Sequence, residues 1–170
     1  MLNTILLSSF LMISPVQMER PCLVLAQGYV ESRLNCITCH NDINYKHQKL
    51  TNYFKKANVK SAEQLATACL ETHSPRLMAA IAIKEGATIT SRKGGYKKQY
   101  QGAWQVNPKI HGYVSHDATM QALQAECILE DLVKENKGNI KKALNQYGGD
   151  ITKRKYADNI IKELQNIPKL

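Results

Sequence analysis

The feature that most constrains the fold is an apolar run, Leu77-Met-Ala-Ala-Ile-Ala-Ile83, between Ser74-Pro75 and Lys84-Glu85-Gly86. Pro is favoured at the first position of a helix and Gly commonly ends one, so the flanking residues predict a helix over this stretch. A helix that is apolar on every side must be enclosed by other elements. We therefore expect a helical domain packed around this segment, with Glu85 at the end of the central helix.

Further helices are predicted from the spacing of apolar residues, at about residues 61–70, 118–135, 140–147 and 153–164. Ser61 and Gln64 have the spacing of a capping box at the start of the first of these. Residues 87–115 differ, because β-branched residues and a Gly94-Gly95 pair favour a small β-hairpin or an ordered loop. The predicted fold class is mainly α with this one excursion.

The composition is ordinary for one globular domain plus a short extra segment, with 170 residues, 44% hydrophobic and 22% charged. The net charge of +9 favours an anionic partner such as nucleic acid, a membrane surface or an acidic wall polymer. The basic residues are scattered without a recognition pattern, so nucleic acid is not expected. No apolar run has the length of a transmembrane helix.

The N-terminal residues have some features of an export signal. The stretch 5–13 is apolar and of suitable length, and Ala26 provides a small residue at a cleavage position. Because the stretch lacks a basic n-region, a buried N-terminal helix and an upstream start are the alternatives. Export would make residues 1–26 a signal peptide, 27–60 a cysteine-containing segment and 61–170 the main domain, in the periplasm or secreted.

Four of the five cysteines would remain after such a cut, namely Cys36, Cys39, Cys69 and Cys127. An even number suits an oxidising compartment, so all four are candidates for disulfides. Three alternatives stay open: haem attachment, a zinc site and free thiols. Cys36-Ile-Thr-Cys39-His40 matches the attachment pattern of haem c, with His40 as an axial ligand. The local spacing of Cys36, Cys39, Cys69 and His73 also resembles a set of zinc ligands.

Glu85 is the leading candidate for a catalytic residue. Its carboxyl group ends an enclosed apolar helix, where partial burial and the negative end of the helix dipole both raise its pKa. A general acid that works near neutral pH needs a raised pKa. The alternative interpretation is an ordinary surface Glu at a helix end.

The segment Gly102-Ala-Trp-Gln-Val-Asn-Pro108 places the only Trp beside two amides. Trp104 offers a face on which a sugar could stack, while Gln105 and Asn107 could bond hydroxyl and acetamide groups. A core Trp with turn-forming amides is the alternative. A third segment, Ala143-Leu-Asn-Gln-Tyr-Gly-Gly149, is typical of a helix end, with Tyr147 before a Gly pair.

Taken in order, the three segments resemble the motifs of the lytic transglycosylase family, in its SLT-type domain with the lysozyme-like fold. That family has an apolar helix ending in Glu-Ser, then Gly-Leu-Met-Gln-Val/Ile with a nearby Pro, then Ala-x-x-x-Tyr-Asn-x-Gly. The resemblance covers about residues 74–164, roughly half of the chain, and includes Tyr156-Ala157 in the family's final helix. Gly86 and Gly148 stand where the family has Ser and Asn, so these two side-chain hydrogen bonds are absent.

The resemblance implies cleavage of the β-1,4 bond between N-acetylmuramic acid and N-acetylglucosamine in peptidoglycan. Glu85 corresponds to the catalytic acid/base, Gln105 to a substrate-contacting residue and Tyr147 to the active-site Tyr. Glycan strands are then the partner, and no cofactor or metal is expected. Wall turnover, a secretion or conjugation machine and a phage are all contexts that the sequence leaves open.

The mechanism can be addressed from the residues. Two-carboxylate glycosidases need a second acid within roughly 5–10 Å of the first, but residues 86–116 contain no Asp or Glu. A single-acid mechanism in which Glu85 protonates the leaving oxygen, and then accepts the proton of the sugar's C6 hydroxyl, predicts a 1,6-anhydro product. A distant acid such as Asp150 could fold back, which leaves a hydrolytic muramidase open. A small exported haem c carrier and a non-catalytic wall-binding protein are the alternatives from other classes.

Overall fold

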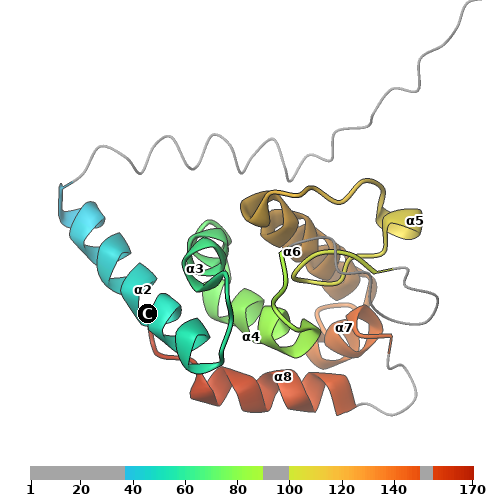
Figure 1. Cartoon of the computed structure of the whole chain (residues 1–170). Helices are drawn as coiled ribbons and strands as arrows, with labels where there is room; N and C mark the ends of the chain where they lie inside the picture. Colours follow the sequence, from blue (N-terminus) through green and yellow to red (C-terminus); the bar gives the residue numbers. More distant parts are fainter. Residues whose placement is uncertain (1–36, 90–99, 150–154) are drawn as a thin grey trace, which may run out of the picture.

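The structure is a computed structural model that describes residues 37–89, 100–149 and 155–170, with side chains from Asn41 onward. These residues form mainly helices, which confirms the predicted mainly α class (Figure 1). In chain order the helices are α2 (Ile37–Lys56), α3 (Ala62–Leu70), α4 (Pro75–Glu85), α5 (Pro108–His111), α6 (Ala118–Glu135), α7 (Ile140–Tyr147) and α8 (Lys155–Asn166). None of these described helices is both long enough and apolar enough to cross a membrane.

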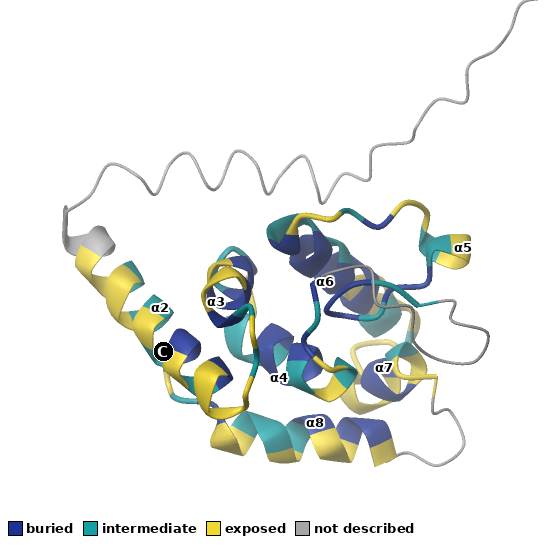
Figure 2. Ribbon diagram, in the orientation of Figure 1, coloured by how far each residue is buried: buried dark blue, intermediate teal, exposed yellow. Residues whose placement is uncertain are grey.

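Helix α4 is the central element, as its apolar sequence predicts. Residues Met78–Ala82 are all buried, and α3 and α8 pack against the helix (Figures 1 and 2). Pro75 occupies its first turn, and Gly86 ends it with a φ of 95°. Gly adopts this left-handed conformation without strain, so the chain can turn sharply directly after Glu85.

Helices α2, α3, α6, α7 and α8 contribute buried side chains to one apolar core with α4. Helix α3 also packs against α2 and α6, whereas α7 packs against α6 and α8. The buried side chains lie on the inward faces of these helices, and the exposed ones cover the outside (Figure 2). Each amphipathic helix thus contributes one face to the core, which is the arrangement expected from the 3.6-residue period.

Helix α2 belongs to this same core, although the sequence suggests a separate segment for residues 27–60. Leu50 and Phe54 of α2 are fully buried, one turn apart, in the core that also holds α3. The correction has a simple cause, because these two side chains anchor a helix that is otherwise polar and basic. Residues 27–36 of the expected segment lie outside the described residues.

An ordered loop, rather than a β-hairpin, occupies the described part of residues 87–115. Gln101 and Val106 form one isolated antiparallel bridge, in which each backbone N–H donates to the other's carbonyl at 2.9 Å. The short helix α5 follows directly. Residues 90–99, which include the Gly94-Gly95 pair, lie outside the described residues.

Candidate active site

Glu85 lies half-buried in the last turn of α4, where α8 supplies its partner. The Tyr156 hydroxyl donates a hydrogen bond to Glu85 Oε1 at 2.6 Å. Burial raises the pKa of Glu85 above its ordinary value of 4.5, and the weaker effects of the Tyr156 hydrogen bond and the Lys84 charge lower it. Glu85 therefore keeps its proton to a higher pH than an exposed Glu, as a general acid requires.

Tyr147, the last residue of α7, is the second phenol near Glu85. Burial and the negative charge of Glu85 both raise the pKa of Tyr147, and the same two causes raise that of Tyr156. The Tyr147 hydroxyl donates to the Trp104 carbonyl oxygen at 2.8 Å. Both phenols therefore stay protonated at neutral pH and act as hydrogen-bond donors beside the carboxyl group.

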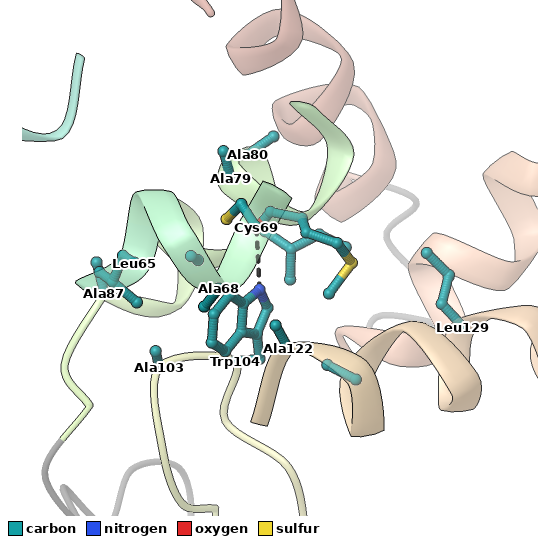
Figure 3. Packing of buried hydrophobic residues seen from close by; sticks show 14 of the residues in the cluster. Leu65, Ala68, Cys69, Ala79, Ala80, Ala87, Ala103, Trp104, Ala122 and Leu129 are labelled. Atoms are coloured by element: carbon teal, nitrogen blue, oxygen red, sulfur yellow. Dashed lines mark hydrogen bonds between the residues drawn. The ribbon is translucent and has the colours of Figure 1, made fainter. Parts of the chain in front are cut away.

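The Trp104 ring has no role in stacking on a sugar, so the sequence prediction for this residue is wrong. Trp104 is fully buried, and its indole N–H donates to the Met78 carbonyl oxygen at 2.9 Å. Figure 3 shows the ring among the small side chains of Ala68, Ala103 and Ala122. These small residues leave space inside the core, and the large indole fills it.

Three of the predicted site residues do meet: Gln105, Asn107 and Tyr147 line one pocket of about 320 Å³. This pocket lies between the loop at residues 100–111 and helices α6 and α7. Its wall also includes the apolar side chains of Ile128 and Leu132. Glu85 does not line the pocket itself. Tyr147 does line it, and the negative charge of Glu85 is one cause of the raised pKa of Tyr147.

The two amides of this pocket have fixed positions. Gln105 has a φ of 50°, a conformation that costs a non-glycine residue about 1 kcal/mol, and its Nε2 donates to the Gly102 carbonyl oxygen at 2.9 Å. Asn107 is buried, and its Oδ1 accepts the Lys109 N–H at 3.0 Å, which caps α5. Asn107 thus has a structural role at the pocket wall. Gln105 has a strained backbone conformation, and such conformations cluster at functional sites.

Gln121 of α6 holds the loop that carries these amides, and the sequence analysis missed it. Its buried side chain accepts the Ala103 N–H at 2.8 Å and donates to the carbonyl oxygens of Ser115 at 2.8 Å and Ile89 at 3.1 Å. A Cβ on Gly102 would lie 2.5 Å from Gln121 Oε1, so only Gly leaves room for this bond. A polar residue in a helix gives no sequence signal for such a role.

Tyr156 was placed in a final helix by the sequence analysis but was not selected as a site residue, and its contact with Glu85 was missed. A Cβ at Gly148 would lie 2.3 Å from two carbon atoms of the Tyr156 ring. The φ of Gly148 is −75°, which any residue can adopt, so space and not backbone conformation requires Gly here. The lytic transglycosylase motif has Asn at this position. In this chain the residue is Gly, and the Tyr156 ring packs closely against it near Glu85.

No carboxylate in the described part of the chain contributes to the raised pKa of Glu85. A second acid close enough to assist hydrolysis would raise that pKa further by repulsion. Glu135 does line the pocket, where it accepts a hydrogen bond from Gln146 Nε2 at 3.3 Å. Asp150 lies outside the described residues.

Among the described residues, one group of side chains could hold a metal ion: His73, Glu126 and Glu130, whose ligand atoms lie within 4.8 Å of one another. The buried Glu126 already has a structural role. Its two oxygens accept the backbone N–H groups of His73 at 3.1 Å and Ser74 at 3.0 Å, next to the positive end of α4.

The cysteines only partly follow the sequence prediction. Cys69 has a free thiol, so its predicted disulfide is wrong, because this face of α3 is fully buried in the apolar core. Burial raises the pKa of Cys69, which makes the thiol unsuited to binding zinc as a thiolate. Cys127 is disulfide-bonded. Cys36 and the side chains of Cys39 and His40 lie outside the described residues, so the haem c alternative stays a prediction.

Comparisons of the chain with protein-family models, curated protein sequences and solved structures find no match. The assignment of a function therefore depends on the residues of the site and on the sequence motifs.

Proposed function

We propose that this protein is an exported peptidoglycan lytic transglycosylase with a lysozyme-like arrangement of helices. One observation carries the proposal: Glu85, a carboxyl group with a raised pKa, lies beside two protonated phenols, and one of these lines a pocket with Gln105 and Asn107. The order of residues along the chain supports it, because Glu85, then Gln105 with Asn107, then Tyr147 come in turn from the three family-like motifs, and Tyr156 follows them. The net charge of +9 suits an anionic wall polymer.

In the proposed reaction, protonated Glu85 donates its proton to the glycosidic oxygen as the bond from C1 of N-acetylmuramic acid breaks. The acetamide of the same sugar stabilises the positive charge that develops at C1. The Glu85 carboxylate then accepts the proton of the C6 hydroxyl, whose oxygen attacks C1. Glu85 is thereby regenerated as the acid, and the muramic acid product is a 1,6-anhydro sugar.

Tyr156 has a defined part in this cycle. Glu85 must be neutral in the first step and ionised in the second, and a hydrogen bond from a phenol stabilises the ionised form. Burial favours the neutral form of Glu85, and the hydrogen bond favours its ionised form. Each effect therefore stabilises the protonation state that one of the two steps needs. The Tyr147 hydroxyl has a single proton to donate. It donates to the Trp104 carbonyl oxygen in this structure, and it would have to leave that bond in order to donate to substrate.

The test is the Glu85→Gln variant on purified peptidoglycan, with product analysis by mass spectrometry. We expect wild type to release 1,6-anhydromuropeptides and Glu85→Gln to release none, since Gln cannot transfer the proton. Glu163→Gln is the matched control, because Glu163 is also half-buried and also accepts a hydrogen bond from a Tyr, Tyr53 of α2. This control should keep full activity.

Each other outcome points to a named alternative. Full clearing by a folded Glu85→Gln variant would exclude Glu85 as the acid. Products with only reducing-end muramic acid would identify a muramidase instead. A Soret band in the purified protein, together with no release of muropeptides, would favour the haem c carrier.

A further inference from the structure

Two large apolar side chains are exposed on the loop that borders the pocket, where the carbonyl oxygen of Tyr113 shares a donor, Gln124 Nε2, with that of the pocket-lining His111. Ile110 of α5 is 70% exposed and lines the pocket, and Tyr113, three residues further on, is 75% exposed. In the ranges that the structure describes, the other exposed large apolar side chains are Tyr45 of α2 and Ile140 of α7, each 56% exposed. Two such residues so close together, next to a pocket, suggest a surface that is covered when a ligand binds.

The loop that carries these two side chains is held in place. Gln124 Nε2 of α6 donates to the carbonyl oxygens of His111 at 3.3 Å and Tyr113 at 3.1 Å. The Asn107 cap fixes the start of α5. Ile110 and Tyr113 are therefore exposed on a backbone that hydrogen bonds hold in place. Such a surface loses little conformational entropy on binding.

The charge of the loop that carries these side chains suits an anionic ligand. Lys109 is exposed next to Ile110, and the sequence has no Asp or Glu from Gly86 to His116, while Glu135 of α6 also lines the pocket. Peptidoglycan carries carboxylates on its stem peptides and presents the apolar faces of its pyranose rings. An aromatic ring beside a cation matches both properties of such a strand.

We propose that Ile110 and Tyr113 form an outer glycan subsite, in which a sugar of the peptidoglycan strand beyond the cleaved bond stacks on the Tyr113 ring. This inference rests on the proposed function, because it takes the occupant of the neighbouring pocket to be the same strand. Tyr113 thus takes the stacking role that the sequence assigns to the buried Trp104.

The subsite is tested by binding and by cleavage separately. Binding is measured by co-sedimentation with insoluble peptidoglycan in the Glu85→Gln background, and cleavage by initial rates in the wild-type background. We expect Tyr113→Ala to weaken binding about tenfold, equivalent to about 1.4 kcal/mol. The loss should raise KM with little change in kcat, since an outer subsite contributes uniform binding.

Matched variants distinguish stacking from a general effect on the surface. Tyr113→Trp should restore binding, because indole offers a larger aromatic face. Tyr45→Ala removes an exposed Tyr of α2 whose ring also has a lysine beside it, with Lys49 Nζ 4.2 Å from the ring centroid, and should leave binding unchanged. Ile110→Ser should weaken binding about threefold, and Ile140→Ser should not.

The two proposals fail in different ways. If wild type cleaves peptidoglycan but Tyr113→Ala binds it within twofold of its parent, the subsite is wrong and the proposed function stands. If Tyr113→Ala loses binding but wild type releases no muropeptides, the subsite stands and the proposed function is wrong. If the Glu85→Gln parent does not co-sediment with peptidoglycan at all, the subsite is wrong.

Discussion

Glu85 experiences two opposing effects, because burial disfavours its charge and the Tyr156 hydroxyl favours it. Burial is the larger effect, so the pKa is raised. A single acid that acts twice in one cycle benefits from this balance, since each effect stabilises one of its two protonation states. The phenol is therefore a positioning residue whose contribution should be visible in the dependence of the rate on pH.

Tyr156→Phe should move the alkaline limb of the pH–rate profile to higher pH. The hydrogen bond from Tyr156 lowers the Glu85 pKa, so its removal raises that pKa further. The active form is the protonated acid, and activity is lost as pH rises through the pKa, so a higher pKa extends activity to higher pH. The measurement is kcat/KM between about pH 4 and pH 9, a range that starts near the ordinary carboxyl pKa and extends well above it.

Tyr53→Phe is the control for this experiment, because it removes a Tyr hydroxyl that donates to Glu163 rather than to Glu85. Its profile should coincide with that of wild type. An alkaline limb that stays in place, or moves to lower pH, in Tyr156→Phe would show that Tyr156 does not control the protonation of Glu85.

Residue type alone predicted part of the site. Gln105 and Asn107 were selected from one short motif and Tyr147 from another, and the three residues line a common pocket. Trp104 was misassigned because a Trp suits a sugar platform and a core equally well, and only the small residues around it decide which. Tyr156 was missed because its role depends on a contact across 71 positions of sequence.

Helices with a clear apolar period were predicted within a few residues of their observed ends. Pro75 and Gly86 mark the ends of α4, and the period of apolar residues marks α6. The Ser61 cap was only half right, because Ser61 is the N-cap residue of α3 but its side chain makes no capping hydrogen bond. Helix α2 could not be recognised, since tertiary packing of two side chains, rather than a continuous apolar stripe, holds it in place.

The turn between α7 and α8 should tolerate no side chain at position 148. Gly148→Ala would place a Cβ 2.3 Å from the Tyr156 ring, so the ring or the start of α8 must shift. We expect a loss of about 1–3 kcal/mol in the free energy of unfolding, as for other overpacked sites. Cleavage should fall roughly 10- to 100-fold, because the phenol is displaced from Glu85. Urea unfolding and initial rates measure the two effects.

Gly138→Asn provides the comparison in the neighbouring connection between α6 and α7. A Cβ there meets nothing within 4 Å, and Asn tolerates the left-handed φ of 83° better than other residues do. This variant should keep its activity. Wild-type rates in Gly148→Ala would contradict the close packing of Tyr156 on the turn.

The whole molecule shares one core from α2 to α8, and Cys69 lies inside it with a free, fully buried thiol. We predict that Cys69 reacts with a thiol reagent only when the molecule opens globally. The alkylation rate at Cys69 should therefore rise with denaturant in proportion to the unfolded fraction. Peptide mapping by mass spectrometry identifies the labelled residue.

The same experiment on Cys69→Ser provides the background, because it removes the thiol under study. Fast alkylation of Cys69 without denaturant, at a rate that denaturant does not change, would show that α3 opens locally and that the core is not one cooperative unit. Retention of the slow rate after truncation of Phe54 to Ala would likewise contradict a core shared with α2.

Trp104 connects the apolar core with the wall of the pocket, two parts of a protein that are usually mutated independently. Its indole N–H is bonded to the Met78 carbonyl of α4, and its own carbonyl accepts the bond from Tyr147 at the end of α7. Trp104 therefore fills the apolar core with its indole ring, and its backbone carbonyl also positions the Tyr147 hydroxyl at the wall of the pocket. For the proposed enzyme, substitutions beneath this indole should change substrate turnover as readily as thermal tolerance, so greater stability at constant activity is better sought on the outer faces of α2 and α6.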